Sequence, residues 1–408
     1  MNQTLTQSNG PVVILHLSDL HFDGNEGHQG SIGRSSVFDA LMNEIKSLEK
    51  DWSPSVVCIS GDIAYQNKQS GYEEAIEWLK KLLLELSIER EGVFVCPGNH
   101  DVDREKASFL VRPHDVGEAD RVLRLPIPDH YKSLFVRYEE FCKALRLLPY
   151  DFNDSQEYFV GSREYKNINF VCNNSCWCSM DEEDENSLWL GQNFIKSLKL
   201  PLILNLDNQI TISLMHHPKE SYHVNERITR DQRIATLDYL ASISHIILTG
   251  HTHGSPRKPD ILHDNAIIFS GGCYESERYQ NSYSLIRLWP ERLYLDIKQY
   301  EWDVVRSSWS VFYEESNYKL RIKETLERRD YQFTEKIKQE VEAKTERECS
   351  QTEIEEIYNV IRHHVDSLDY SEAIKVYEDK RDILDSSKDK YKDLVMKIEI
   401  LIAEAKDE

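Results

Sequence analysis

The chain contains short apolar runs that each end in a cluster of polar residues. The runs are rich in β-branched side chains and are bounded by Gly, Pro or Asn, a pattern typical of buried strands. Amphipathic helical patterns lie between several of them, for example at 36–50 and 72–86. This alternation predicts an α/β fold in which helices flank layered sheets. The runs are VVILHLSD (12–19), SVVCISGD (55–62), GVFVCPGNHD (92–101), INFVCNNS (168–175), QITISLMHH (209–217) and HIILTGHTH (245–253).

Asp, His and Asn gather where these runs end, which is the edge at which open α/β sheets place their ligand sites. Side chains two residues apart at the end of a strand point the same way, so Asp19 and His21 can bind one cation together. His251 and His253 have the same spacing and can serve two cations. The clusters are Asp19-Leu20-His21, Gly61-Asp62, Gly98-Asn99-His100-Asp101, His216-His217-Pro218 and Gly250-His251-Thr252-His253.

These five clusters, in this order, resemble the motifs of the calcineurin-like metallophosphoesterase superfamily. The resemblance extends from about Val12 to at least Leu288. Its specific parts are GNHD (98–101) and GHTH (250–253), because a Gly-Asp pair alone is too common to identify a family. The resemblance implies a layered β-sandwich flanked by helices, with a centre for two divalent metal ions.

The resemblance also implies a role for each polar residue of these clusters. Asp62 would bridge the two ions, and the ions would activate a bridging hydroxide as the nucleophile. Oxygen and imidazole ligands suit Mn²⁺, Fe²⁺ or Zn²⁺, and the sequence does not choose among them. The first ion would be bound by Asp19, His21 and His253, and the second by Asn99, His216 and His251.

Three further histidine and aspartate residues have expected roles outside the ligand set. By the same resemblance, His100 would stabilise or protonate the departing oxygen, and Asp101 would hold and polarise His100. His217 adjoins His216, but adjacent residues on a strand point to opposite faces. Packing is therefore the leading interpretation of His217, and contact with a metal or the substrate is the alternative.

A basic stretch, KESYHVNERITRDQR (219–233), follows the His216-His217-Pro218 cluster. Arg227, Arg230 and Arg233 are spaced by three, which is compatible with one helix face. One interpretation is a phosphate-recognising lip over the metals, with Arg227 and Arg230 as substrate-binding residues. The favoured alternative is a solvated surface helix paired with its own acids, Glu226 and Asp231.

Glycine and proline divide the chain into two parts. All 16 Gly lie at or before Gly272 and all 12 Pro at or before Pro290, and the region beyond has a charged, amphipathic helical pattern. We predict a phosphoesterase domain at 1–313, with an insertion at about 102–158 over the mouth of the sheet, and an α-helical C-terminal domain at 314–408. The C-terminal helices carry no motif chemistry, so we expect partner docking or self-association. A chain ending near Tyr313 that kept the same mass and partners would refute this hypothesis.

The net charge and the positions of the cysteines limit the classes of function that we expect for this chain. The net charge of −22 repels phosphate backbones and disfavours nucleic acid as a partner. No apolar stretch is long enough to span a membrane, no signal peptide is evident, and cysteines within apolar runs indicate reduced thiols, so we expect a cytoplasmic protein. The leading prediction is a metal-dependent hydrolase of phosphodiester or related bonds in small nucleotidyl substrates such as cyclic nucleotides. The alternatives are a nuclease of the same superfamily and a phosphoesterase-fold subunit that acts within a larger assembly through its helical tail.

Overall fold

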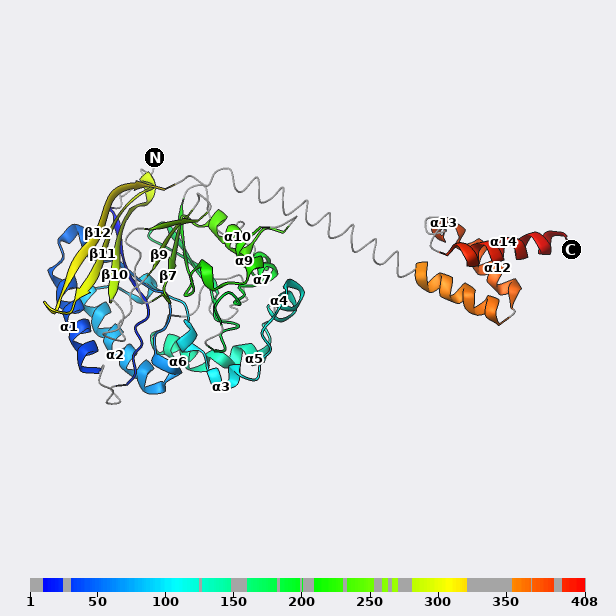
Figure 1. Ribbon diagram of the computed structural model, residues 1–408. Helices are drawn as coiled ribbons and strands as arrows, with labels where there is room; N and C mark the ends of the chain where they lie inside the picture. The colour runs from blue at the N-terminus through cyan, green and yellow to red at the C-terminus, as the bar shows by residue number, and fades with distance from the viewer. Residues whose placement is uncertain are drawn as a thin grey trace, which may run out of the picture. The chain divides into compact units, whose positions relative to one another are not determined.

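Two six-stranded sheets form the body of the N-terminal part of the chain (Figure 1). The computed structural model describes residues 10–24, 31–124, 127–147, 160–181, 184–198, 200, 209–229, 233–252, 259–262, 266–270, 281–320, 354–367, 369–384 and 391–407. The chain divides into two units, Met1–Glu327 and Arg328–Glu408. No helix among the described residues combines the length and the apolar content needed to cross a membrane.

The first sheet has the strand order β12-β11-β10-β1-β2-β3. Its first three strands in the chain run parallel and come from three of the apolar runs, so those predicted strands are confirmed. A meander of three antiparallel strands extends the sheet on the other side of β1. The strands are β1 (Val12–Leu17), β2 (Val56–Ile59), β3 (Val93–Val95), β10 (Ser282–Trp289), β11 (Tyr294–Asp303) and β12 (Ser308–Lys319).

The second sheet has the order β4-β5-β6-β7-β9-β8. Its four central strands are parallel, and an antiparallel strand closes each edge. The remaining three apolar runs form β5, β6 and β7, as predicted. The strands are β4 (Gly161–Tyr165), β5 (Ile168–Cys172), β6 (Ile210–Leu214), β7 (Ile246–Thr249), β8 (Asp260–Leu262) and β9 (Ala266–Ser270).

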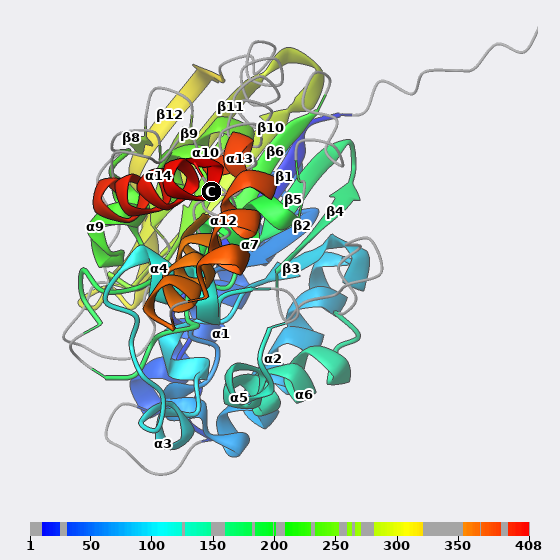
Figure 2. The ribbon, with the colours of Figure 1, turned by 90° about the vertical axis from the view of Figure 1, so that its right-hand side faces the viewer.

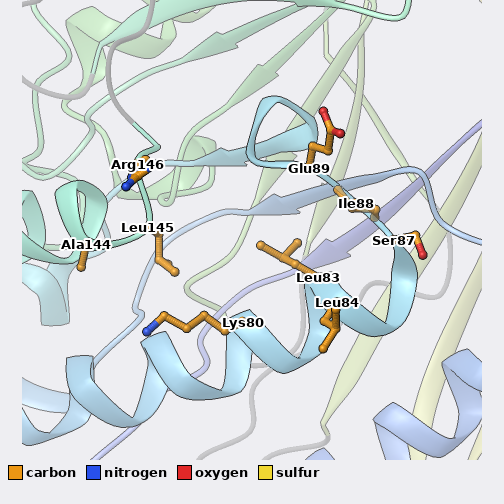
Figure 3. Close-up of a pocket in the computed structure, with 9 residues that line it drawn as sticks. All are labelled: Lys80, Leu83, Leu84, Ser87, Ile88, Glu89, Ala144, Leu145 and Arg146. Atoms are coloured by element: carbon orange, nitrogen blue, oxygen red, sulfur yellow. The ribbon is translucent and has the colours of Figure 1, made fainter.

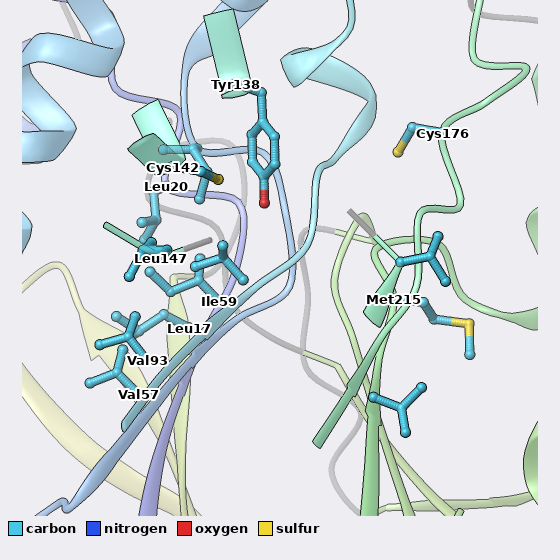
Figure 4. Packing of buried hydrophobic residues seen from close by; sticks show 14 of the residues in the cluster. Leu17, Leu20, Val57, Ile59, Val93, Tyr138, Cys142, Leu147, Cys176 and Met215 are labelled. Carbon is cyan, nitrogen blue, oxygen red and sulfur yellow. The ribbon is translucent and has the colours of Figure 1, made fainter. Parts of the chain in front are cut away.

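One hydrophobic cluster joins the facing sides of the two sheets. Alternate strand residues from both sheets contribute to it, and the rings of Phe94 and Phe170 stack across it with centroids 3.9 Å apart. The intervening strand residues, such as Leu17 and Ile59, belong to a second cluster that includes residues of the helices (Figure 4). Both faces of the central strands are therefore buried, which explains their nearly continuous apolar sequences.

Helices cover the outer faces of the sandwich (Figure 1). The helix α1 lies against the first sheet, where it contacts β12, and α2 packs against α6, which lies in the predicted insertion (Figure 2). The predicted helices at 36–50 and 72–86 correspond to α1 and α2. The helices that the structure describes in this unit are α1 (Ser31–Ser47), α2 (Gln69–Leu86), α3 (Arg104–Ala107), α4 (Val116–Val122), α5 (Asp129–Lys132), α6 (Val136–Ala144), α7 (Gln192–Ser197), α9 (Val224–Arg227) and α10 (Thr236–Ile243). Short 3-10 turns occur at Lys50–Trp52, Tyr65–Asn67, Arg90–Gly92, Asn99–Asp101, Ser133–Phe135, Lys219–Ser221 and Pro290–Arg292.

The described part of the C-terminal unit is helical, as predicted. It contains a helix at 354–366, α12 (Tyr370–Asp379), α13 (Arg381–Leu384) and α14 (Lys392–Asp407). These helices bury a hydrophobic cluster of their own, which includes Tyr358, Tyr377 and Ile398.

The predicted domain boundary at 313/314 differs from the structure, because Tyr313 lies inside β12. The pairing of β12 with β11 continues to Lys319, opposite Tyr294. Apolar and polar residues alternate less clearly in this long outer strand, so the sequence pattern placed the domain boundary before the end of the strand. A chain cut after Glu327 preserves the strand, whereas a cut near Tyr313 removes part of it.

Candidate metal centre

The two sheets bring the carboxyl ends of five strands together. Asp19 and His21 follow β1, Asp62 follows β2, and residues 99–101 follow β3, and these three strands are parallel neighbours in one sheet. His216 and His217 follow β6, and His251 follows β7, which are parallel neighbours in the other sheet. Described residues of five clusters that are distant in sequence therefore lie near one another in space.

The loops after β1 and β2 form one side of this centre. Asp19, His21 and Asp62 are fully buried, and all three have backbone φ angles between 46° and 54°. Non-glycine residues rarely adopt this left-handed conformation, and where they do the strain is often linked to function. His21 Nε2 lies 3.8 Å from Asp19 Oδ1 and 3.6 Å from Asp62 Oδ2. The three side chains thus face one another across a short gap.

The opposite side is formed by imidazoles and an amide. Asn99 Oδ1 lies 3.0 Å from His216 Nε2 and 3.0 Å from His251 Nδ1. His216 Nδ1 lies 2.7 Å from the backbone oxygen of Ser60, and this contact leaves Nε2 facing the centre. The backbone N–H of His251 donates to both oxygens of Asp19, at 3.2 and 3.0 Å, and so links the two sides.

Two glycines are required by the close approach of these loops. A Cβ atom on Gly98 would lie 2.1 Å from Asp62 Oδ1, and one on Gly250 would lie 1.7 Å from Ser18 Oγ. Neither position can accept a side chain without moving a loop that carries an expected ligand. The glycines of the GNHD and GHTH motifs are therefore part of how the centre is assembled.

Asp101 is fully buried beneath the centre. Its carboxylate accepts hydrogen bonds from the backbone N–H groups of Ile63, Ala64 and Gly98 and from the Tyr72 hydroxyl. These contacts fix the loop after β2 to the loop after β3. The expected support of His100 by Asp101 stays a prediction, since these hydrogen bonds are all to other residues.

His100 is only partly buried and lies at the edge of the centre. Its ring stacks on Tyr65, with centroids 5.1 Å apart, and meets the His21 ring edge-on at 4.6 Å. The backbone N–H of Gln66 donates to His100 Nδ1 at 3.3 Å. A nitrogen that accepts a hydrogen bond carries no proton, so in the neutral ring the proton is on Nε2.

The centre has strongly coupled charges. Burial alone would raise the pKa of Asp62, but the His216, His100 and His21 imidazoles outweigh burial and hold this pKa well below its usual range. Burial lowers the pKa of His216, but the Asp62 carboxylate, with a smaller contribution from Asp19, more than compensates and raises this pKa to about 9. The Asp62 and Asp19 carboxylates therefore stabilise a positive charge that lies between them.

Divalent cations fit the residues present. Asp62 Oδ2 is buried without a full hydrogen bond from any described residue, because the nearest imidazole nitrogens are 3.4 and 3.6 Å away. Among the residues that the structure describes, ligand atoms within 4.8 Å of one another occur in three groups, and Asp62 belongs to two of them. Carboxylate, amide and imidazole donors around a buried oxygen are suitable ligands for Mn²⁺, Fe²⁺ or Zn²⁺. The groups are His21–Asp62–His100, Asp19–Asp62–His216 and His216–His217–His251.

Some expected residues are not placed at the centre. His253 and Arg230 lie outside the described residues. Arg227 ends the four-residue helix α9, so the predicted single helix face through Arg233 is wrong. Arg233 instead interacts with Glu226 and Gln192. This arrangement agrees with the interpretation that the basic stretch is paired with its own acids.

Sequence reasoning missed several residues that support the centre. Ser175 and Tyr222 contact His217, and Ser60 contacts His216 through its backbone. Ser60 directly precedes the Gly61-Asp62 cluster, so its position offered a signal. Ser175 and Tyr222 offered none, because they approach His217 from other loops.

A separate hollow of about 530 Å³ lies where the C-terminal end of α2 meets the end of α6 (Figure 3). Lys80 and Arg146 give it two basic side chains, and Leu83, Ile88 and Leu145 supply apolar surface. None of the expected ligands lines this hollow, so it is distinct from the metal centre.

Comparisons with known proteins agree with this geometry. The family model of calcineurin-like phosphoesterases matches residues 12–255. A metallophosphoesterase-like protein of Bacillus subtilis, YydB, is 23% identical over 263 residues, covering 60% of this chain and 49% of that protein. The 3',5'-cyclic adenosine monophosphate phosphodiesterase CpdA of Haemophilus influenzae is 23% identical over 137 residues, covering 33% of this chain and 45% of that protein. A probable cyclic nucleotide phosphodiesterase of Coxiella burnetii is 32% identical over 90 residues, covering 22% of this chain and 32% of that protein.

A dimetal phosphatase from Danio rerio is among the solved structures that the chain matches, with 12% identity and a TM-score of 0.39. The match covers 75% of this chain and 99% of that chain. The chain spans about half or less of the length of the curated relatives that it matches. The family model covers more than half of this chain, and its match includes every described residue of the centre. The chain belongs to the calcineurin-like phosphoesterase family.

Proposed function

We propose that the chain is a two-metal phosphodiesterase that hydrolyses small nucleotidyl phosphodiesters. The observation that carries this proposal is the position of Asp62, whose carboxylate belongs to two groups of ligand atoms, one with His21 and His100 and the other with Asp19 and His216. A carboxylate shared in this way is suited to bridge two cations. Asp19 and His21 would hold one ion with Asp62, and Asn99, His216 and His251 would hold the other.

The ions would supply two effects when bound: they lower the pKa of a shared water and neutralise the charge on the phosphate oxygens. The chain's own residues supply the remaining requirements. Burial of Asp19, His21, Asp62 and His216 excludes bulk water from the ligand side of the centre. A site with less water strengthens the attraction between these groups and a phosphate-bound cation pair.

His100 is the residue best placed to donate a proton to the departing oxygen. Its Nδ1 accepts the Gln66 N–H, so the Nε2 of the neutral ring carries the proton. The stacked Tyr65 ring holds the imidazole in one plane beside His21. A partly exposed donor next to buried ligands suits a leaving group that projects toward solvent.

The proposed substrate class is supported by two kinds of observation. The Haemophilus and Coxiella relatives are described as cyclic nucleotide phosphodiesterases. In addition, a net charge of −22 is unfavourable for binding a long phosphate backbone. The insertion packs beside the loop that holds His100, through Arg137 of α6 and the backbone oxygen of Asn67, so it would influence which leaving group fits.

A substrate panel tests this proposal. The metal-free protein is supplied with Mn²⁺, Fe²⁺ or Zn²⁺ and assayed with bis(p-nitrophenyl) phosphate, p-nitrophenyl phosphate, 3',5'-cyclic nucleotides, linear dinucleotides and single-stranded DNA. We expect turnover of the diester and of at least one cyclic nucleotide, and slower turnover of the monoester. Cleavage of DNA with a steep salt dependence and no turnover of cyclic nucleotides would instead indicate a nuclease. A protein that binds metal and cleaves none of these substrates would refute the proposal.

A further inference from the structure

His217 lies beside an expected ligand, and its ring points into the same space. Strand β6 ends at Leu214, so the alternation of side chains along a strand does not apply at His216 and His217. The His217 ring centroid is 4.9 Å from that of His216 and 4.5 Å from that of His251, and the latter two are 5.2 Å apart. Ring nitrogens of the three residues lie within 4.8 Å of one another. Three imidazoles therefore surround one point.

Hydrogen bonds hold the His217 backbone in place. The Tyr222 hydroxyl donates to the His217 backbone oxygen at 3.0 Å, and it also lies 3.3 Å from the Met215 sulfur.

Ser175 holds one nitrogen of the His217 ring. Ser175 Oγ lies 2.9 Å from His217 Nδ1, and it also accepts the backbone N–H of His217 at 3.3 Å. A hydroxyl oxygen can accept a hydrogen bond from Nδ1–H, and in that tautomer Nε2 presents a lone pair.

The other ring nitrogen of His217, Nε2, is buried next to the other imidazoles. His217 is fully buried, and its Nε2 has no hydrogen-bond partner among the residues that the structure describes. An unsatisfied buried nitrogen costs free energy. A lone pair cannot donate to a phosphate oxygen, whereas it can bind a cation. His216 and His251 each bring a ring nitrogen to the same space, so the arrangement favours a metal-binding role for His217 over a substrate-binding one.

We propose that His217 Nε2 is an additional ligand of the ion held by His216 and His251. This inference rests on the proposed two-metal centre and adds a third imidazole to one of its two sites. A site with three imidazoles is richer in nitrogen than the carboxylate side, so it should prefer Zn²⁺ or Fe²⁺ to Mn²⁺. Ser175 is then a positioning residue, which fixes the tautomer and the orientation of the ring.

Metal titration of the full chain tests this assignment. Metal-free protein is titrated with Zn²⁺ by calorimetry, with a competing chelator, and with Co²⁺ while the visible spectrum is recorded. The variants are His217→Phe, which keeps a ring but removes both nitrogens, and Ser175→Ala, which removes only the acceptor for Nδ1–H. His130→Ala, at an exposed histidine, is the matched control.

We expect two ions in the wild-type protein and in His130→Ala. In His217→Phe, one ion should bind with unchanged affinity and the other more than about 100-fold more weakly, and the Co²⁺ spectrum should change because a nitrogen ligand is lost. In Ser175→Ala, the same ion should bind about 10- to 100-fold more weakly, which is the effect typical of losing an outer hydrogen bond to a ligand.

The possible results separate this inference from the proposed function. Two ions bound by His217→Phe with wild-type affinities and an unchanged Co²⁺ spectrum would overturn the inference and leave the proposed function intact. A wild-type protein that binds no divalent ion would overturn both. Thermal melting of each metal-free variant checks folding. If His217→Phe does not fold, Ser175→Ala decides the matter: wild-type affinity in that variant would overturn the inference, and a weakened site would support it.

Discussion

The two sides of the metal centre are built on different principles. The carboxylate side (Asp19, His21 and Asp62) has left-handed loops after β1 and β2, and its acidic oxygens receive backbone N–H groups. The imidazole side (His216, His217 and His251) is oriented by a backbone carbonyl at His216 and by hydroxyl groups at His217.

The carboxylate side supplies the negative charge of the centre, whereas the groups behind the imidazoles determine the direction of the ring nitrogens. Loss of a carboxylate removes negative charge that attracts both ions. Charged groups exposed on the surface interact too weakly to compensate for this loss. Loss of a hydroxyl or carbonyl behind an imidazole leaves the charge unchanged and alters only the direction of a ring nitrogen. We therefore expect changes on the carboxylate side to have larger effects than changes to the supports of the imidazole side.

The largest effect should come from Asp62→Asn. The amide has nearly the same shape but no charge, and Asp62 is the carboxylate that two of the three groups of ligand atoms share. Affinity for both ions should fall by more than about 100-fold, and turnover of a chromogenic diester should be lost. Calorimetry and elemental analysis measure the first effect. Asp129→Asn, at a fully exposed carboxylate, is the control, and equal metal content in the two variants would contradict the shared role.

The second effect separates proton transfer from metal binding. His100→Ala should reduce turnover by about 10²- to 10⁴-fold, the range typical of general acid catalysis, while both ions remain bound. A diester with a nitrophenolate leaving group, which needs little protonation, should be less affected than a nucleotide substrate. Depleted metal in His100→Ala would show that this histidine is a ligand instead.

The smallest effect should come from Arg137→Met in the insertion. Arg137 Nη1 donates to the Asn67 backbone oxygen at 2.6 Å and steadies the turn whose Gln66 N–H contacts His100. Gln66 and Asn67 both have left-handed φ angles, so the turn needs outside support. We expect about a tenfold lower kcat with little change in KM, because a hydrogen bond of this kind contributes on the order of 1 kcal/mol.

Two further measurements make the Arg137 prediction specific. Arg137→Lys, which keeps a donor, should recover part of the lost kcat. The pH dependence of kcat should also change in Arg137→Met, because His100 would lose the fixed acceptor role of Nδ1. A KM effect without any change in the pH profile would mean that Arg137 only shapes the substrate pocket.

The sequence was sufficient for the strands and for most of the centre, for a physical reason. Parallel strands place their carboxyl ends at one edge, so polar residues after each apolar run are brought together by topology alone. Asp19, His21, Asp62, Asn99, His216 and His251 therefore did not need to be near one another in sequence.

The remaining features depend on contacts that no local pattern encodes. The direction of His217 is set by Ser175 and Tyr222 after the strand has ended, so the alternation rule could not predict it. The sequence spacing was compatible with one helix through Arg233, but helix α9 ends at Arg227. Arg233 instead contacts Glu226 and Gln192. The last strand extends past the predicted boundary because its pairing with β11 continues to Lys319.

The most direct test of the metal centre is a crystal structure of protein loaded with Zn²⁺ or Mn²⁺, with anomalous diffraction recorded at the absorption edge of the metal. Our account predicts two anomalous peaks about 3.5–4 Å apart, with the Asp62 carboxylate between them and His216 and His251 beside only one of them. A single peak, or peaks that Asp62 does not contact, would contradict it.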